Sequence, residues 1–230
     1  EDKEERRYLN ENRFNPTQLH NNCSGKHLGF LAVSKFIEGD KYTKKNYVSI
    51  NHPVQEMVKK VFEDLTGVSD PKFGLDGCSA PNFTCSVKSL ARSMANLANP
   101  IQFRNERKIA ITRLRDSALR NPHLIAGKDR LCTKLMKKSA GRFIVKVGAE
   151  GVYTAILLEE GLGVALKVTD GSSRAAECLI VTILVRFGLL NEKDPEIDCL
   201  LRKPIINWAN HITGFLKATD NVWERGTPLI

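Results

Sequence analysis

Apolar residues recur every three to four positions through the first 140 residues, a spacing typical of amphipathic helices. The pattern predicts helices over about residues 26–38, 53–66, 86–98, 104–120 and 129–139. Pro53 suits the first turn of the second helix and Gly67 its end. Leu28 and Phe36 belong to the predicted apolar pattern of the first helix, and Leu114 to that of the fourth.

After residue 140 the pattern changes to short apolar runs bounded by glycine, which is typical of strands. Strands are expected over residues 142–146, 151–158 and 163–168, the last two as an antiparallel hairpin. A further helix is expected from about 172 to 187, and residues 205–216 fit one more short strand or helix. This order predicts an α+β fold with helices packed on an antiparallel sheet. Because such a sheet needs more strands than the pattern shows, we expect the fold to be incomplete.

Length and composition fit one globular domain. The chain has 230 residues, 42 % hydrophobic and 27 % charged, which argues against disorder or a coiled coil. We expect a polar lead-in over residues 1–20, one domain over 21–220 and a tail over 221–230. The first seven residues are all charged, unlike a signal peptide, and no apolar run reaches the roughly 18–20 residues of a membrane span. No membrane partner is therefore expected.

The six cysteines form no C-x-x-C pair and no short framework. A disulfide scaffold is therefore not expected, and a reducing, cytoplasmic location is the more natural setting. Cysteines are also common as small buried apolar residues. Cys23 and Cys78 do not suit that role, because both stand among turn-forming residues.

The formal net charge of +9 arises from one segment. Residues 101–146 hold thirteen basic and three acidic residues, a net +10, so the rest of the chain carries −1. Such a segment attracts phosphates, but a solvated helix face is the commoner explanation. Aromatic residues do not alternate with the basic ones, so a base-stacking surface is not expected. We expect no nucleic-acid partner. A nucleic-acid-binding module that uses this segment is the weakest alternative.

Residues 20–27, His-Asn-Asn-Cys-Ser-Gly-Lys-His, place a thiol, a hydroxyl, an amine and two imidazoles around one glycine. They stand where a helix is predicted to start, and exposed amides there favour an anion or a thiolate. A plain helix cap with incidental polar residues is the alternative. The convergence of so many functional groups favours a site.

Two further segments carry candidate chemistry. Residues 73–82 form a predicted loop in which Asp76 and Cys78 flank a glycine, so both side chains can face one point. A rigid surface turn is the alternative there. Lys146 ends an apolar strand before Gly148 and Gly151, so its ammonium can lie beside approachable backbone. Alone, a strand-end lysine reaching into water would explain it.

Together these segments give the chain a specific resemblance. It resembles the bacterial asparaginase II family, the group that includes the thermolabile, inducible rhizobial asparaginase. The motifs H-N-N-C-S-G-K-H, D-G-C-S-A-P-N and K-V-G-A-E-G-V-Y stand in the family's order. Connecting segments at residues 51–55, 65–67, 122–127 and 166–171 also match. The resemblance runs from about Leu19 to Leu189.

The resemblance implies hydrolysis of L-asparagine to L-aspartate and ammonia, in a fold similar to that of serine β-lactamases and penicillin-binding proteins. It implies an optional zinc site at Cys23, Lys26 and Cys78, and no organic cofactor. A lysine must lose its proton to bind zinc, so binding is expected to weaken as pH falls. The spacing of the cysteines would not itself have indicated a metal.

The same resemblance assigns the other site residues. His27 and Asp76 match residues that line the substrate site, and Lys146 matches an active-site lysine. That lysine also looks like the lysine of the β-lactamase K-T-G motif, with Val147 in place of the threonine. Cys132 matches a family cysteine near the site.

The nucleophile is the main departure from the family. Amide hydrolysis needs a nucleophile, and in this family serine–lysine pairs upstream of the first segment provide it. Residues 1–22 contain no serine. The chain is truncated, or it works with a separate upstream chain, or it is a degenerate, non-catalytic protein. The absence of an initial methionine and the shortage of strands favour truncation.

We therefore expect an asparaginase-type amidohydrolase whose nucleophilic serine lies upstream of this chain. A non-catalytic, zinc-binding or regulatory relative is the main alternative. The sequence leaves open the preference for asparagine or glutamine, the zinc occupancy and the oligomeric state, for which a homodimer is one option.

Overall fold

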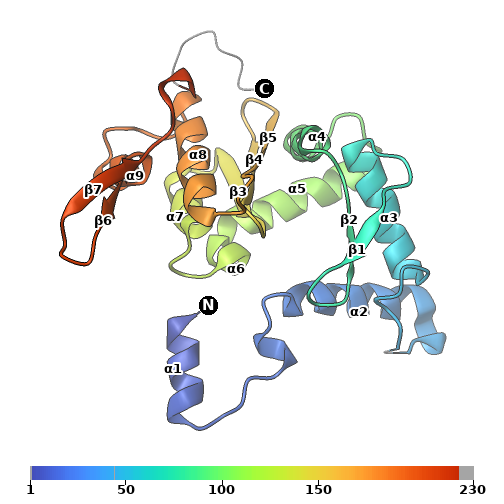
Figure 1. The fold of residues 1–230 in the computed structure, drawn as a ribbon. Coiled ribbons are helices and arrows are strands. Elements are labelled where there is room, and N and C mark those ends of the chain that lie inside the picture. The colour runs from blue at the N-terminus through green and yellow to red at the C-terminus, as the bar shows by residue number, and fades with distance from the viewer. Residues whose placement is uncertain (1, 44, 223–230) are drawn as a thin grey trace. The chain divides into compact units, whose positions relative to one another are not determined.

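The computed structural model describes residues 2–43 and 45–222 (Figure 1). Helices make up 50 % of the chain and strands 15 %, the strands in small antiparallel sheets, so the predicted α+β class is confirmed. The similarity to the β-lactamase fold stays a prediction. The chain divides into two compact units, residues 1–89 and 90–230, and each is described by itself. The domain limits predicted from the sequence stay predictions.

The first unit contains three helices and a short hairpin (Figure 1). Its elements are α1 (Lys3–Glu11), the 3₁₀ turn η1 (Gln18–His20), α2 (Ser24–Glu38), the 3₁₀ turn η2 (Gly39–Lys41), α3 (Pro53–Thr66), β1 (Phe73–Leu75) and β2 (Pro81–Phe83). Helices α2 and α3 confirm the first two predicted helices. The predicted lead-in contains α1, and the predicted loop over residues 73–82 is a β-hairpin with a tight turn.

Local chemistry explains where α3 begins and ends. The His52 imidazole accepts a hydrogen bond from the backbone N–H of Val54 at 3.3 Å, and Pro53 occupies the first turn. Gly67 ends the helix with a φ of +72°, a left-handed conformation that glycine adopts without strain. The helix is therefore anchored at both ends by the residues that the sequence indicated.

The first unit has a small apolar core. Val54 and Ala80 are its buried hydrophobic side chains among the described residues, and Pro71 and Pro81 are also buried. The predicted apolar pattern of α2 does not mark a buried face, because Leu28 and Phe36, which belong to it, are 68 % and 89 % exposed. The helical spacing was correct, but no described element of this unit covers that side of α2.

The second unit contains most of the buried apolar residues. Its elements are α4 (Val87–Ala98), which begins at the end of the first unit, α5 (Asn105–Arg120), α6 (Pro122–Ala126), α7 (Leu131–Lys138), β3 (Phe143–Val147), β4 (Val152–Leu157), β5 (Leu162–Lys167), α8 (Ser173–Arg186), α9 (Pro195–Leu201), β6 (Lys203–Ile206), β7 (Ile212–Leu216) and the 3₁₀ turn η3 (Asp220–Val222). The strands predicted over 142–168 are confirmed within one or two residues. Residues 205–216, predicted as one strand or helix, contain strand β7 and the end of β6.

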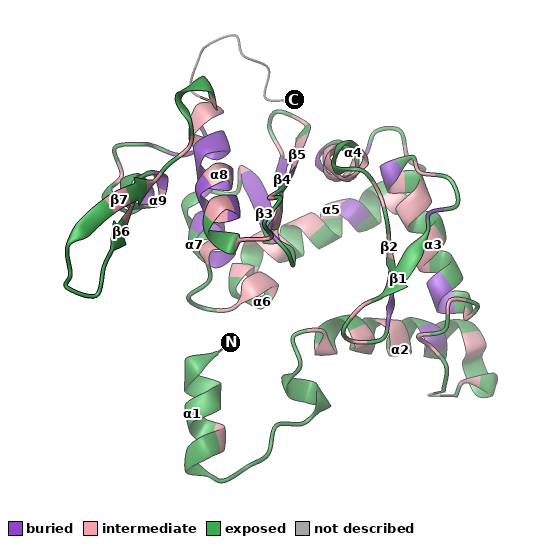
Figure 2. Ribbon diagram, in the orientation of Figure 1, coloured by how far each residue is buried: buried purple, intermediate pink, exposed green. Residues whose placement is uncertain are grey.

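Strands β3, β4 and β5 form an antiparallel sheet in sequential order. Figure 2 shows that buried residues gather on this sheet and on α8. Phe143, Tyr153, Leu157 and Ile180 are among the largest fully buried side chains. Leu114, which belongs to the predicted apolar pattern of α5, is 70 % exposed, and Ile111 is the buried residue of that helix. The core therefore forms around the sheet rather than around α5.

The edge strand β5 lies against the backbone of α4. A Cβ atom on Gly163 would collide with the backbone of Ala91 and Ala95. Glycine is therefore required there for the close approach. No helix among the described residues is long and apolar enough to cross a membrane.

Candidate functional site

The turn between β1 and β2 brings a carboxylate and a thiol together. The backbone N–H of Asp76 donates to the carbonyl of Ala80 at 2.9 Å, and Ser79 adopts a φ of +69°, so the chain reverses sharply. The Asp76 carboxylate accepts the N–H of Gly77 at 2.7 Å. The Cys78 thiol lies 3.7 Å from Oδ2 of Asp76 and donates to it. Ala80 is fully buried, which anchors the turn in the first unit.

The start of α2 supplies three more functional groups. Cys23 is the capping residue, and Lys26 and His27 follow in the first turn. Residues three and four positions apart share one face of a helix, so these side chains point the same way. The backbone N–H of Cys23 donates to the Asn21 side chain at 2.8 Å, whereas the Cys23 thiol makes no capping hydrogen bond.

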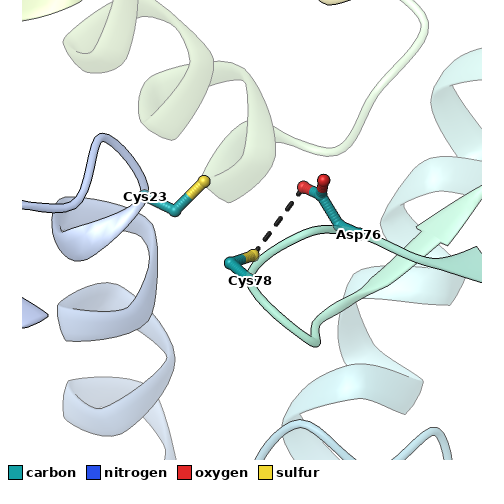
Figure 3. Close-up of side chains that lie close together, drawn as sticks. All are labelled: Cys23, Asp76 and Cys78. Atoms are coloured by element: carbon teal, nitrogen blue, oxygen red, sulfur yellow. Dashed lines mark hydrogen bonds between the residues drawn. The ribbon is translucent and has the colours of Figure 1, made fainter. Parts of the chain in front are cut away.

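The two segments, 50 residues apart in sequence, meet at one point. One potential metal-ligand atom each from Cys23, Asp76 and Cys78 lies within 4.8 Å of the others, the single such group found in the described part of the chain. Figure 3 shows these three side chains directed toward a common space. Nζ of Lys26 donates to Oδ2 of Asp76 at 3.1 Å. The structure thus brings four of the predicted site residues together.

Lys26 and Asp76 form an ammonium–carboxylate pair. The hydrogen bond from Lys26, helped by the Gly77 amide, holds the pKa of Asp76 below its usual value. Burial lowers the pKa of Lys26, but hydrogen bonds to Cys78 and Asp76 outweigh it, so the pKa lies above its usual value. Both side chains are therefore charged at neutral pH.

The two thiols differ in acidity. Burial alone would raise the pKa of Cys78, but interactions with His27, the Ala80 backbone and Lys26 stabilise the thiolate and lower it to about 7. Burial raises the pKa of Cys23, and the neighbouring Cys78 raises it further. At neutral pH the thiolate therefore lies mainly on Cys78.

His27 connects the cluster to Tyr47, a residue that the sequence did not indicate. Nδ1 of His27 lies 2.7 Å from the Tyr47 hydroxyl oxygen. Nε2 is buried without a complete hydrogen bond to a described residue, although the imidazole lowers the pKa of Cys78. The two observations agree if Nε2 lies near the Cys78 sulfur at an angle that does not satisfy hydrogen-bond geometry. Tyr47 lies in a polar loop, and neither spacing nor a motif marks it.

A cavity of about 410 Å³ adjoins this cluster. Side chains between residues 17 and 31 line it, together with Tyr47 and Cys78. Two larger hollows, of about 760 Å³ beside α9 and about 680 Å³ beside α1, contain none of the predicted site residues. The chemistry of the walls, rather than the volume, therefore identifies the smaller cavity as the candidate site.

The second unit holds the two remaining predicted residues. Lys146 on β3 is exposed, and its Nζ donates to the carbonyl of Val147 at 2.6 Å. The buried sulfur of Cys132 lies 3.0 Å from the Tyr153 hydroxyl and accepts the backbone N–H of Val147 at 3.3 Å. Cys132 therefore supports the strand end that carries Lys146. That either residue belongs to the site stays a prediction.

The chain contains one S-x-x-K string, Ser69-Asp-Pro-Lys72. It lies between α3 and β1, outside any helix, and both Ser69 and Lys72 are exposed. A serine and a lysine three residues apart become neighbours when a helical turn brings them together. The string therefore lacks the local structure that would pair a nucleophile with its base.

Comparison with known protein families decides the relationship. The family model for L-asparaginase II matches residues 1–218. The chain belongs to the L-asparaginase II family. The match to this family also covers residues 1–18 and the β6–β7 hairpin, which lie outside the span of the sequence motifs. It confirms the resemblance, and with it the general class of asparaginase-type amidohydrolases. A search of curated proteins gave no match.

Proposed function

We propose that this chain forms part of an enzyme that hydrolyses L-asparagine to L-aspartate and ammonia. The gathering of Lys26, His27, Asp76 and Cys78 beside one cavity, in a member of the L-asparaginase II family, carries the proposal. The volume of about 410 Å³ is ample for a small polar molecule.

The charges of the cluster suit an amino-acid substrate. Asparagine carries an α-ammonium group, an α-carboxylate and a side-chain amide. The Asp76 carboxylate complements the ammonium group, and the Lys26 ammonium complements the carboxylate. His27 can donate a hydrogen bond to a substrate oxygen. Because Lys26 and Asp76 are paired with each other, the substrate's two opposite charges can take the place of that pair.

We also propose a zinc site at Cys23, Lys26 and Cys78. The donor set fits, since two sulfurs and an amine lie close together and thiolates are ordinary zinc ligands. Lys26 is the unusual member, because its raised pKa opposes loss of the proton. Asp76 offers an alternative third ligand. When bound, zinc would supply a positive charge that polarises a substrate oxygen.

The attacking serine is proposed to lie outside residues 1–230, in a serine–lysine block. Residues 1–22 contain no serine, and Ser69 and Lys72 are not on a helix. Lys146 would then stabilise developing negative charge or transfer a proton, with its strand end supported by Cys132.

Ammonia release from L-asparagine tests this function. The 230-residue chain is compared with the product of its reading frame extended upstream, and each is assayed as wild type, as His27→Ala and as the control Ser69→Ala. We expect activity in the extended form alone, its loss in His27→Ala and its retention in Ser69→Ala. If the 230-residue chain is active and Ser69→Ala abolishes that activity, the nucleophile lies within this chain, and our placement of it upstream is wrong.

A second function, zinc binding without hydrolysis, is favoured by the cluster of Cys23, Asp76 and Cys78 itself. It would be supported by zinc affinity in a protein that releases no ammonia from asparagine or glutamine in either form. All six cysteines are free, which suits the proposed cytoplasmic location. A homodimer remains a proposal for the oligomeric state, and no nucleic-acid partner is proposed.

A further inference from the structure

Two aromatic side chains hold His27 in place. Its ring meets Tyr47 edge-on, with centroids 5.6 Å apart, and Phe30 in a similar way at 5.8 Å. Nδ1 is 2.7 Å from the Tyr47 hydroxyl oxygen. Two ring contacts and one hydrogen bond therefore hold the orientation of the imidazole.

The hydrogen bond to Tyr47 also bears on which ring nitrogen carries the proton. A phenol is protonated at neutral pH and can donate one hydrogen. The Tyr47 hydroxyl makes no other hydrogen bond with the described residues, so its hydrogen is available to Nδ1 of His27, 2.7 Å from the oxygen. A neutral imidazole that accepts at Nδ1 carries its proton at Nε2.

Tyr47 is itself anchored to α3. The Gln55 side chain is fully buried, and its amide nitrogen donates to the Tyr47 carbonyl at 2.9 Å. Gln55 lies in the first turn of α3, where His52 caps the helix. The hydroxyl of Tyr47 therefore approaches His27 from a backbone held by a buried hydrogen bond.

Nε2 of His27 approaches the Cys78 sulfur but has no aligned hydrogen-bond acceptor among the described residues. It is buried and without a hydrogen bond to the described residues, and His27, Tyr47 and Cys78 line the same cavity. A buried N–H group without an acceptor costs free energy, so a ligand oxygen in the cavity would be bound favourably.

We propose that Tyr47 is a positioning residue, which holds His27 in the tautomer with its proton on Nε2 so that this nitrogen donates to a carboxylate or amide oxygen of the substrate. The identity of the substrate rests on the proposed function. The tautomer of His27 rests on the geometry of the first unit alone. An experiment can therefore refute the tautomer without refuting the proposed substrate, and the reverse.

Long-range ¹H–¹⁵N NMR of histidine-labelled protein, at a pH where the imidazole is neutral, tests the tautomer. His27→Gln assigns the signals, and Tyr47→Phe removes the hydroxyl but keeps the ring. Tyr42→Phe is the matched control, since its hydroxyl makes no hydrogen bond with the described residues.

In wild type we expect a protonated Nε2 and a hydrogen-bonded Nδ1. In Tyr47→Phe the Nδ1 signal loses that hydrogen bond and a minor Nδ1–H tautomer appears. A protonated Nδ1 in wild type, or identical His27 signals in Tyr47→Phe, overturns the proposal.

Kinetics of the full enzyme test the role in binding. Tyr47→Phe is expected to raise KM for L-asparagine about three- to tenfold, with a smaller change in kcat, and Tyr42→Phe to change neither. Unchanged thermal unfolding shows that the variants are folded. Hydrolysis with equal KM in wild type and Tyr47→Phe refutes the positioning role and leaves the proposed function standing. A wild type that neither binds nor hydrolyses L-asparagine, yet shows the expected tautomer change, refutes the proposed function and upholds the positioning of His27.

Discussion

Cys78 has an electrostatic environment that its partner Cys23 lacks. Because the pKa of Cys78 is lowered to about 7 and that of Cys23 is raised, Cys78 should be alkylated first. Its rate with iodoacetamide should rise through about pH 7 and level off above it. Peptide mass spectrometry at a series of pH values measures both rates. His27→Gln removes a stabilising interaction, so its Cys78 profile should shift to higher pH. Equal profiles for both cysteines in wild type would contradict the assignment.

The carboxylate of Asp76 distinguishes the two possible zinc ligand sets. Asp76→Asn keeps an acceptor for the Gly77 amide but removes the charge that raises the pKa of Lys26. If Lys26 is the ligand, it loses its proton more easily, so zinc binding should begin at lower pH than in wild type. Zinc affinity measured by competition with a chelator between about pH 5 and pH 8 tests this. Zinc affinity that falls at every pH, with no shift of its onset to lower pH, would instead favour Asp76 as the ligand.

Residue types and local turns could be inferred at this scale, but distances could not. The turn formers around Asp76 and Cys78 indicated that both side chains face one point, and they lie 3.7 Å apart. That Cys23 joins them depends on tertiary packing across more than 50 residues, and only the family resemblance suggested it. Tyr47 was missed because a tyrosine in a polar loop has no spacing that links it to His27.

At the scale of elements, Gly163 of β5 is required by the helix beside it. An alanine there would push its Cβ into the backbone of Ala91 and Ala95, which cannot move as a side chain can. Gly163→Ala should destabilise the protein by about 2–3 kcal/mol, or lower Tm by about 4–10 °C. Gly214→Ala is the control, because its nearest neighbour would be 4.0 Å away. Thermal unfolding followed by circular dichroism measures both, and equal Tm values would show that α4 does not approach β5 so closely.

Periodicity predicted the long elements of this fold and missed the short ones. Helices α2, α3, α5 and α8 each extend over 14 to 16 residues, long enough for a repeat to be recognised. Helix α6 has five residues and strand β1 three, too few for a pattern. The spacing also could not show which apolar faces are covered. Leu28, Phe36 and Leu114 have helical spacing, yet each is exposed.

Across the whole molecule, buried apolar residues are distributed unequally between the two units. The first unit buries Val54, Ala80 and two prolines among its described apolar residues, whereas the sheet and α8 of the second unit share one continuous core. Local opening requires less free energy where few apolar contacts are lost. We therefore expect amide hydrogens of α2 and α3 to exchange faster than those of β3, β4 and α8.

Zinc offers a way to test the site and this difference in stability together. A ligand that binds only the folded state slows amide hydrogen exchange in the segments that hold it. When free zinc is about 100 times its Kd, the exchange rate falls by up to about 100-fold. Protection is expected at the start of α2 and in the β1–β2 turn, since these segments carry Cys23 and Cys78. Hydrogen exchange measured by mass spectrometry with and without zinc reports both segments separately. In Cys78→Ser the effect should be much weaker in both. Protection confined to the second unit, or equal in wild type and Cys78→Ser, would place the metal elsewhere. A zinc ion held by Cys23 and Cys78 must slow the opening of both the start of α2 and the β1–β2 turn, because each segment supplies one of its ligands.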